Sequence, residues 1–185
     1  MKKPIIIISA YSVNGRVIGA KNRLPFRLRT DLINFMKTTE NHIVISGSKS
    51  YESIPDKQRP LKNRFNIVVS RNPDYYPSQA NNQTMLCRSL EEAVRVAQAM
   101  EYGEKIFIIG GGEIYAQALK STAFNIDEII ATEVYGNDIV GDTYFPYIDP
   151  SQWTRTVLRE VTASEEAQDS HSFAILSMKP ILQAA

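Results

Sequence analysis

The sequence predicts an α/β fold: a single domain with a mostly parallel, mixed β-sheet, flanking helices and a C-terminal antiparallel hairpin. Short β-branched runs recur along the chain, and helical patterns separate most of them. Such alternation is typical of parallel sheets. The last two strand-like runs have no helical pattern between them, which favours antiparallel pairing. We expect one domain over residues 1–185, with its core within about 5–178.

The first half of the chain alternates buried strands with helices. Residues 5–8 are four isoleucines, which suits a strand covered on both faces. Residues 12–27 form a long irregular loop, and long loops within domains are usually functional. A helix is expected over 28–37, with an apolar stripe made of Leu28, Leu32, Phe35 and Met36. A strand, a short helix and another strand are expected at 42–46, 49–54 and 66–70.

The second half begins with a polar connection over residues 71–83, which is the segment most suited to a disordered tip. Ser89 and Glu92 have the spacing of a capping box and predict a helix to about residue 100. The remaining expected elements are a strand at 105–109, a helix ending near 120, and strands at 126–134, 153–161 and 171–178.

Composition excludes several classes of function. The 21 basic and 20 acidic residues give a net charge of +1, which offers no broad attraction to nucleic acid or anionic membranes. Cys87 is the only cysteine, and His42 and His171 are the only histidines. A disulfide or a multi-histidine metal site is therefore not expected. The first apolar run is too short for a signal peptide or a membrane span, so we expect a reducing, aqueous compartment.

Asp31 is the acid best placed to hold a ligand. It lies four residues before Phe35, so both side chains share one face of the expected helix. A carboxylate among apolar neighbours needs a partner, because burying it alone is costly. From position alone, a first-turn or N-cap acid stabilised by the helix dipole is the favoured interpretation. The functional alternative is an anionic anchor for paired N–H donors, such as those of a 2-amino pyrimidinone ring.

Three segments at strand ends carry groups that suit phosphate. The glycines at 110–112 let a backbone approach a ligand and expose helix amides, although a tight turn explains them equally well. Residues 47–50 combine hydroxyls, a cation and free amides, and Ser70 and Arg71 end a third strand. Taken singly, Lys49 and Arg71 are more simply explained as solvent-exposed surface charges than as ligand-binding residues. Their shared position is where open α/β folds bind dinucleotides.

Six motifs occur in a recognisable order along nearly the whole chain. They are GRVIG at 15–19, LPF at 24–26 followed by Asp31 and Phe35, GSKSYESI at 47–54, PLKNRFNIVVSR at 60–71, IIGGGEIY at 108–115 and GDTYFP at 141–146. Together they resemble dihydrofolate reductase. In that family a mobile loop precedes a helix that carries one essential acid, with the spacing seen here.

The resemblance implies a pterin site around Asp31. This carboxylate would hold the ring's 2-amino group and N3, with support from the Thr132 hydroxyl. Arg64 would clamp the glutamate α-carboxylate of the substrate, because a planar guanidinium suits bidentate binding. The expected catalytic set is Asp31, Phe26, Leu24, Thr132 and Tyr115. The expected substrate-binding set is Ser9, Ala10, Tyr11, Asp31, Leu32, Phe35, Ser53, Ile54, Leu61, Arg64 and Ile109.

The resemblance also implies NADPH as the cofactor. Main-chain groups of Tyr11 and Ile18 would take the nicotinamide carboxamide. Arg71 and Lys49 would meet the 2′-phosphate, which favours NADPH over NADH, and Ser50 and the glycine turn would receive the pyrophosphate. The turn's first Gly–Gly peptide is expected to be cis. The expected set is Tyr11, Ile18, Gly19, Gly47, Ser48, Lys49, Ser50, Ser70, Arg71, Ile109, Gly111, Gly112, Glu113, Ile114, Tyr115, Gln117 and Thr143.

The implied activity is reduction of 7,8-dihydrofolate to tetrahydrofolate in one-carbon metabolism. Hydride would reach pterin C6, water would protonate N5, and closure of the 12–27 loop would exclude solvent. The implied partners are dihydrofolate and antifolate inhibitors, with no nucleic acid or membrane, in a cytoplasmic monomer.

Five positions depart from the family pattern. Tyr11 stands where a small residue is usual, which predicts an inhibitor pocket reshaped by its bulk, with weaker binding of diaminopyrimidine antifolates. Phe26 replaces a usual Trp, Ser48 and Lys49 replace a frequent basic pair, and Glu113 adds an acid at a helix N-terminus.

Two alternatives stay open. A pyrimidine reductase of riboflavin synthesis shares the fold and the cofactor half, but it lacks the Asp31–Phe35 pair after a Leu-Pro loop. A non-catalytic NADPH- or folate-binding module is the second alternative, and the presence of Asp31, Thr132 and Tyr115 argues against it.

Overall fold

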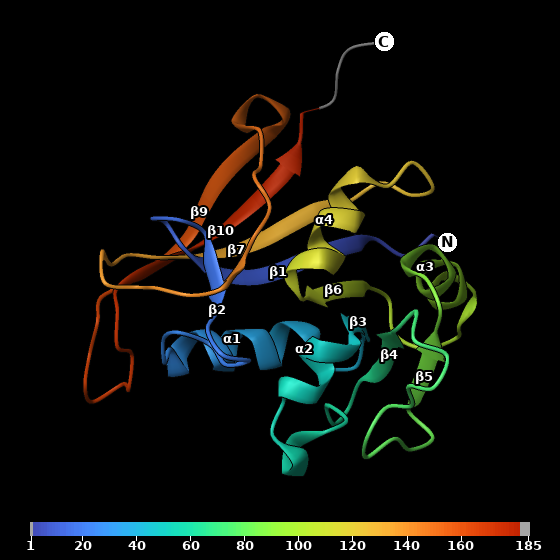
Figure 1. Ribbon diagram of the computed structural model, residues 1–185. Coiled ribbons are helices and arrows are strands. Elements are labelled where there is room, and N and C mark those ends of the chain that lie inside the picture. Colours follow the sequence, from blue (N-terminus) through green and yellow to red (C-terminus); the bar gives the residue numbers. More distant parts are fainter. Residues whose placement is uncertain (1, 182–185) are drawn as a thin grey trace.

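An eight-stranded sheet runs through the molecule, in the order β5-β4-β3-β6-β1-β7-β10-β9 (Figure 1). This computed structural model describes residues 2–181. The main-sheet strands are β1 (Ile5–Ser12), β3 (Ile43–Gly47), β4 (Phe65–Val69), β5 (Thr84–Cys87), β6 (Ile106–Gly110), β7 (Glu128–Val134), β9 (Trp153–Val161) and β10 (Phe173–Pro180). Pairs from β5 to β7 are parallel, whereas β10 is antiparallel to both β7 and β9. The predicted fold class is confirmed.

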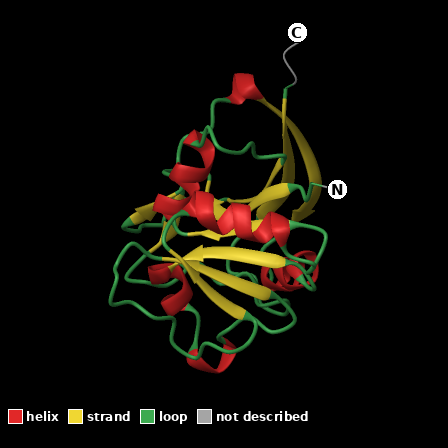
Figure 2. Ribbon diagram, turned by 90° about the vertical axis from the view of Figure 1, so that its right-hand side faces the viewer, coloured by secondary structure: helices red, strands yellow, loops and turns green. Residues whose placement is uncertain are grey.

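Helices cover both faces of this sheet (Figures 1 and 2). The helices are α1 (Arg29–Thr39), α2 (Ser48–Ser53), α3 (Leu90–Ala99) and α4 (Gly112–Lys120), with 3-10 turns at Asp56–Gln58 and Pro150–Gln152. Ile5 and Ile7 of β1 pack in one core cluster with residues of α3 and α4. Ile6 and Ile8 belong to a cluster on the other face, against which Phe35 of α1 packs. Side chains on both faces of β1 are therefore buried, as expected for a central strand.

The irregular segments differ from the prediction in two ways: residues 71–83 are ordered, and short strands occur that were not predicted. Residues 71–83 are not a disordered tip, because Tyr75 and Ser78 hydrogen-bond the Glu52 carboxylate on α2. The strand β5 that follows was not expected. The 12–27 loop and the connection between β7 and β9 each contribute a short strand. These strands, β2 (Val17–Gly19) and β8 (Thr143–Tyr144), form a separate two-stranded sheet.

Only some residues of the predicted apolar stripe of α1 are buried in the core. Leu28 is buried just before the helix, but Leu32 is 54% exposed and Met36 is 44% exposed. Leu32 and Phe35 line a cavity instead of filling the interior. An amphipathic pattern shows only that one face is apolar, so it does not distinguish a core from a ligand cleft.

The capping box of α3 is confirmed in part. The Ser89 hydroxyl accepts a hydrogen bond from the Glu92 amide at 3.1 Å, while the Glu92 carboxylate accepts from the Arg88 amide at 2.6 Å. The Glu92 carboxylate thus bonds to the residue before the N-cap, whereas in a standard capping box it bonds to the N-cap residue itself. None of the helices in residues 2–181 has the length and apolar character needed to cross a bilayer. Of the C-terminal tail, residues 182–185 lie outside the described part.

Candidate functional site

Two adjoining cavities form one cleft. Their volumes are about 620 and 650 Å³, and both are lined by Ile18, Leu24, Ser50 and Gly111. These residues belong to segments at or beyond the carboxyl ends of β1, β3 and β6. In open parallel sheets this edge is where ligands bind, since the strand ends leave main-chain groups and loops free.

The first cavity is predominantly apolar and contains Asp31. Its wall includes most of the predicted substrate-binding and catalytic residues: Ser9, Ala10, Leu24, Phe26, Asp31, Leu32, Phe35, Ser53, Ile54, Leu61, Ile109, Tyr115 and Thr132. These come from β1, the 12–27 loop, α1, α2, the connection between α2 and β4, β6, α4 and β7. Distant parts of the chain therefore meet around a single carboxylate.

Asp31 faces this cavity instead of capping its helix. It lies in the first turn of α1, whose N-cap position is Leu28. The Thr132 hydroxyl on β7 donates a 2.5 Å hydrogen bond to Oδ1 of Asp31. Burial raises the pKa of Asp31, the Thr132 hydrogen bond lowers it, and the charge of Asp169 raises it, with a net upward shift. The structure thus places Asp31 as a cleft acid held by one hydroxyl.

Tyr115 of α4 is a buried residue that lines the same cavity. Its hydroxyl donates to the Ile8 carbonyl on β1 at 2.9 Å, and its ring centroid lies 4.9 Å from that of Phe145. Burial raises the pKa of this phenol above its usual range. Tyr115 is therefore a neutral wall residue that ties α4 to the strand bearing Ser9 and Ala10.

The second cavity is a polar groove. It is lined by predicted cofactor residues, namely Ile18, Gly19, Gly47, Ser48, Lys49, Ser50, Ser70, Arg71, Gly111, Gly112, Glu113, Ile114, Gln117 and Thr143. Two further predicted cofactor residues, Ile109 and Tyr115, line the apolar cavity instead.

The glycine turn brings the groove close to the start of α4. The Gly110–Gly111 peptide is cis, as expected. A Cβ added to Gly111 would lie 2.6 Å from the Ser50 hydroxyl, so a larger residue would displace that side chain. Gly111 is the N-cap of α4 and offers no side chain to the first amides of the helix. Those amides are left for an anion in the groove.

The groove carries more cations than acids. Arg23, Lys49, Arg71 and Arg88 line it, against Glu113 and Asp142. Within residues 2–181, Lys49 and Arg71 form no ion pair. Arg88 instead donates to the Asn72 carbonyl at 2.6 Å and supports the loop that follows Arg71. This donor set fits a phosphate-bearing dinucleotide.

Sequence reasoning missed Arg23 and Arg88 as groove residues. Arg88 follows β5 directly, so recognition of that strand would have placed it at a strand end beside Arg71. It also missed the segment around Gln168, which reaches the apolar cavity from between β9 and β10.

The side chain of Tyr11 does not line either cavity of the cleft. It points to the other face of the sheet, where its ring stacks on Phe145 at 4.9 Å and its hydroxyl donates to Glu133 at 3.2 Å. The expectation that its bulk reshapes the inhibitor pocket is therefore wrong. Its main-chain role toward the cofactor stays a prediction.

Arg64 is also absent from the cavity wall. Its side chain is buried beneath the end of α1, where Nε donates to the Thr39 hydroxyl at 2.8 Å and the terminal nitrogens donate to main-chain carbonyls of Met36 and Lys62. Its proposed grip on a carboxylate stays a prediction.

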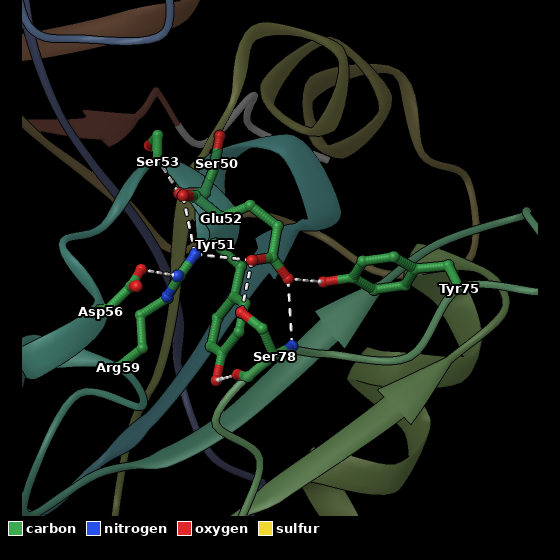
Figure 3. A network of polar contacts seen from close by, with 8 residues as sticks. All are labelled: Ser50, Tyr51, Glu52, Ser53, Asp56, Arg59, Tyr75 and Ser78. Carbon is green, nitrogen blue, oxygen red and sulfur yellow. Dashed lines mark hydrogen bonds and ion pairs between the residues drawn. The ribbon is translucent and has the colours of Figure 1, made fainter.

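A polar network around Glu52 joins α2 to the connection over residues 71–83 (Figure 3). The Glu52 carboxylate accepts hydrogen bonds from the Tyr75 hydroxyl at 2.7 Å and the Ser78 amide at 3.1 Å. It also forms a 2.6 Å ion pair with Arg59. Burial raises the pKa of Glu52, but hydrogen bonds from Ser78 and Tyr75 and the charge of Arg59 bring it below its usual value. The network joins the helix bearing Ser50 to the loop that follows Arg71.

Comparisons with known proteins agree with this geometry. The family model for dihydrofolate reductase matches residues 4–178. The chain is 33% identical over 175 residues to a dihydrofolate reductase of Bacillus subtilis, covering 95% of each. It is 37% identical over 142 residues to a bifunctional dihydrofolate reductase-thymidylate synthase of Glycine max, but spans only 26% of that protein.

Structural comparison gives the same result. A dihydrofolate reductase from Enterococcus faecalis, solved with NADP(H) and RAB-propyl, matches with a TM-score of 0.80 at 26% identity and 96% coverage of both chains. The fold and the two-part cleft define an α/β reductase. The chain belongs to the dihydrofolate reductase family.

Proposed function

We propose that this protein reduces 7,8-dihydrofolate to 5,6,7,8-tetrahydrofolate with NADPH. The observation that carries the proposal is the Asp31 carboxylate, which is held by Thr132 in an apolar cavity that opens into a cationic groove. A reductase of this kind must hold a flat, apolar heterocycle against a phosphate-bearing nicotinamide cofactor. The two halves of the cleft match these two chemical characters.

Asp31 would bind and orient the pterin. Its Oδ1 accepts the Thr132 hydroxyl, and within residues 2–181 its Oδ2 accepts no hydrogen bond. Oδ2 and the remaining lone pair of Oδ1 are therefore left for the 2-amino group and N3–H of the ring. Such paired, charge-assisted bonds set both the position and the rotation of a planar ligand.

Apolar side chains would hold the faces of the ring. Leu32 and Phe35 extend from α1 and Ile54 follows α2, so they approach the cavity from different elements. The large exposed areas of Leu24 and Leu32 supply apolar surface that a bound heterocycle would cover. Covering these side chains also excludes water around Asp31.

The groove would bind the cofactor. Arg71 and Lys49 are suited to the 2′-phosphate, and the Ser50 hydroxyl with the first amides of α4 to the pyrophosphate. NADPH supplies the hydride when bound. The chain contributes the approach geometry: Ile18, Leu24, Ser50 and Gly111 line both cavities, so the ends of the two ligands would meet there. No protein side chain is required to protonate N5, which water would reach.

One assay tests this proposal against its rivals. Purified protein is mixed with NADPH and dihydrofolate, and nicotinamide absorbance is followed. Loss of absorbance that requires dihydrofolate supports the proposal. Turnover with a pyrimidine of riboflavin synthesis but not with dihydrofolate would overturn it in favour of the alternative reductase, and tight binding of both ligands without turnover would indicate a non-catalytic module. The family match favours neither rival.

We further propose a cytoplasmic monomer in which one chain carries the whole site, including the predicted antifolate-binding surface. In support, the two cavities of one chain already contain the acid and the cations that the proposed reaction needs. The lone, buried Cys87 suits a reducing compartment. Sedimentation equilibrium with and without NADPH tests the state: a mass of one chain supports it, and a stable dimer contradicts it.

A further inference from the structure

The start of α1 is capped by a residue far away in the sequence. Asp169 lies in the connection between β9 and β10 and is only 2% exposed. Its Oδ1 accepts the Thr30 amide at 2.9 Å, and its Oδ2 accepts the Thr30 hydroxyl at 2.6 Å. An isolated antiparallel bridge also joins Asp169 to Leu28. Asp169 therefore contacts the residue before the first residue of α1, Leu28, and the residue after it, Thr30.

This contact replaces a cap that α1 lacks. The first amides of a helix have no partner within the helix, and a side-chain oxygen usually satisfies one of them. The N-cap position of α1 is Leu28, which has no such oxygen. Asp169 supplies it, and a negative charge at this end is also favoured by the helix dipole. Because Asp31 immediately follows Thr30, the cap acts directly beside the cleft acid.

The surrounding segment is also part of the cleft. Gln168 lines the apolar cavity, and its side-chain oxygen accepts from Arg27 at 2.6 Å. The main chain of Ser170 donates to the Arg27 carbonyl at 2.8 Å. The hairpin connection therefore docks onto the end of the 12–27 loop and the start of α1 together.

Asp169 also brings a second negative charge toward Asp31. Within residues 2–181, no cation lies within ion-pair distance of Asp169. Burial contributes most to the raised pKa of Asp31, and the charge of Asp169 adds to it. The other titratable residues that line the cavity with Asp31 are Arg27 from the end of the 12–27 loop, Arg29 from the start of α1 and Tyr115 from α4. From β7, Thr132 presents its hydroxyl.

We propose that Asp169 is a positioning residue for the proposed reaction, on which this inference rests. It fixes the first turn of α1 so that Asp31 faces Thr132 and the cavity, and its charge acts on the Asp31 carboxylate. The two effects are separable. Asp169→Asn retains an oxygen for the Thr30 amide but removes the charge, whereas Asp169→Ala removes both.

The experiment compares these variants with Glu166→Gln. Glu166 is an exposed acid in the same connection, so its substitution removes an equal charge without touching the cap. The Asp31 carboxyl is titrated by carbon-13 NMR in the free proteins, which needs no turnover. We expect Asp169→Asn to lower the pKa of Asp31 and Glu166→Gln to leave it unchanged. The pH profile of kcat/KM for dihydrofolate should shift in the same direction in Asp169→Asn.

Asp169→Ala tests the positioning. We expect kcat/KM for dihydrofolate to fall about five- to tenfold, as for a lost helix cap that also misplaces a ligand group. KM for NADPH should stay unchanged, and Asp169→Asn should recover most of the loss. If Asp169→Ala does not fold, the titration of Asp169→Asn decides.

Two results would overturn the inference: an Asp31 titration identical in wild type and Asp169→Asn, or a folded Asp169→Ala with wild-type kcat/KM. A wild-type protein that binds but does not turn over dihydrofolate would instead overturn the proposed function. The NMR titration tests the Asp169–Asp31 relationship in either case.

Discussion

The Thr132 hydroxyl donates to the Asp31 carboxylate at 2.5 Å, and this bond joins β7 to α1 across 101 residues of sequence. Apolar side chains surround the pair. In such an environment a carboxylate with one neutral donor is destabilised in its charged form relative to water. The free protein therefore holds an acid whose hydrogen-bonding capacity is only partly used.

The raised pKa of Asp31 predicts a cost to stability at neutral pH. The folded protein binds this proton at a higher pH than the unfolded chain does, so the free energy of unfolding falls as pH rises through that interval. Asp31→Asn should therefore raise Tm at neutral pH, by about 2–4 °C for each kcal/mol gained. The gain should shrink in acid, where Asp31 is protonated. Calorimetry across pH checks this, and a less stable variant at neutral pH would contradict it.

Thr132→Val should weaken substrate turnover. It removes the hydrogen bond that lowers the pKa of Asp31, so that pKa should rise further and the carboxylate should lose its orientation. A hydrogen bond to a charged group contributes about 1.5–3 kcal/mol, which predicts a fall in kcat/KM for dihydrofolate of about tenfold or more. Thr132→Ser retains a hydroxyl and is the matched control. Equal steady-state constants in all three proteins would refute the role of Thr132.

Arg71→Gln should affect only the phosphorylated cofactor. Arg71 lines the groove without an ion pair in the described part of the chain, so its charge is available for the 2′-phosphate. Loss of a charge-assisted contact predicts an increase in KM for NADPH of about tenfold, with little change for NADH. Arg95→Gln, at an exposed position of α3, removes the same charge elsewhere. A parallel loss for both cofactors would exclude phosphate recognition by Arg71.

Tyr11→Ala should destabilise the fold without changing inhibitor binding. The ring is 6% exposed and stacks on Phe145, away from the apolar cavity. Loss of such a buried ring costs about 3 kcal/mol. Urea unfolding measures this cost, and Tyr147→Ala, at a 67% exposed ring, provides a comparison with little expected effect. A changed inhibition constant for a diaminopyrimidine in folded Tyr11→Ala would show that the ring acts on the cleft.

Local patterns predicted most of the main sheet and the halves of the cleft. Some elements are specified by a few adjacent residues. Examples are the isoleucine run of β1, the Ser89 cap of α3 and the glycines at 110–112 before α4. β5 was missed because its four residues follow a polar, proline-containing connection and form an edge strand. Pairing with β4, which short-range patterns do not show, makes it a strand.

Residue roles that depend on tertiary contacts could not be predicted in this way. Alternation along β1 puts Tyr11 and Ala10 on opposite faces but did not reveal which face borders the cleft. The motif that contains Arg64 did not reveal that its guanidinium is buried against main-chain carbonyls. The Asp169 cap on Thr30 joins residues 139 positions apart. Its only local signal is the absence of a capping side chain at Leu28.

The most direct test is steady-state turnover of Asp31→Asn with dihydrofolate and NADPH at neutral pH. Asparagine retains the size of the side chain but replaces one acceptor oxygen with a donor and removes the charge. We expect kcat/KM for dihydrofolate to fall by about 100-fold or more, the scale of a lost proton-handling or charged catalytic group, while KM for NADPH stays near the wild-type value. Wild-type turnover by Asp31→Asn would contradict the assignment of this carboxylate as the pterin anchor.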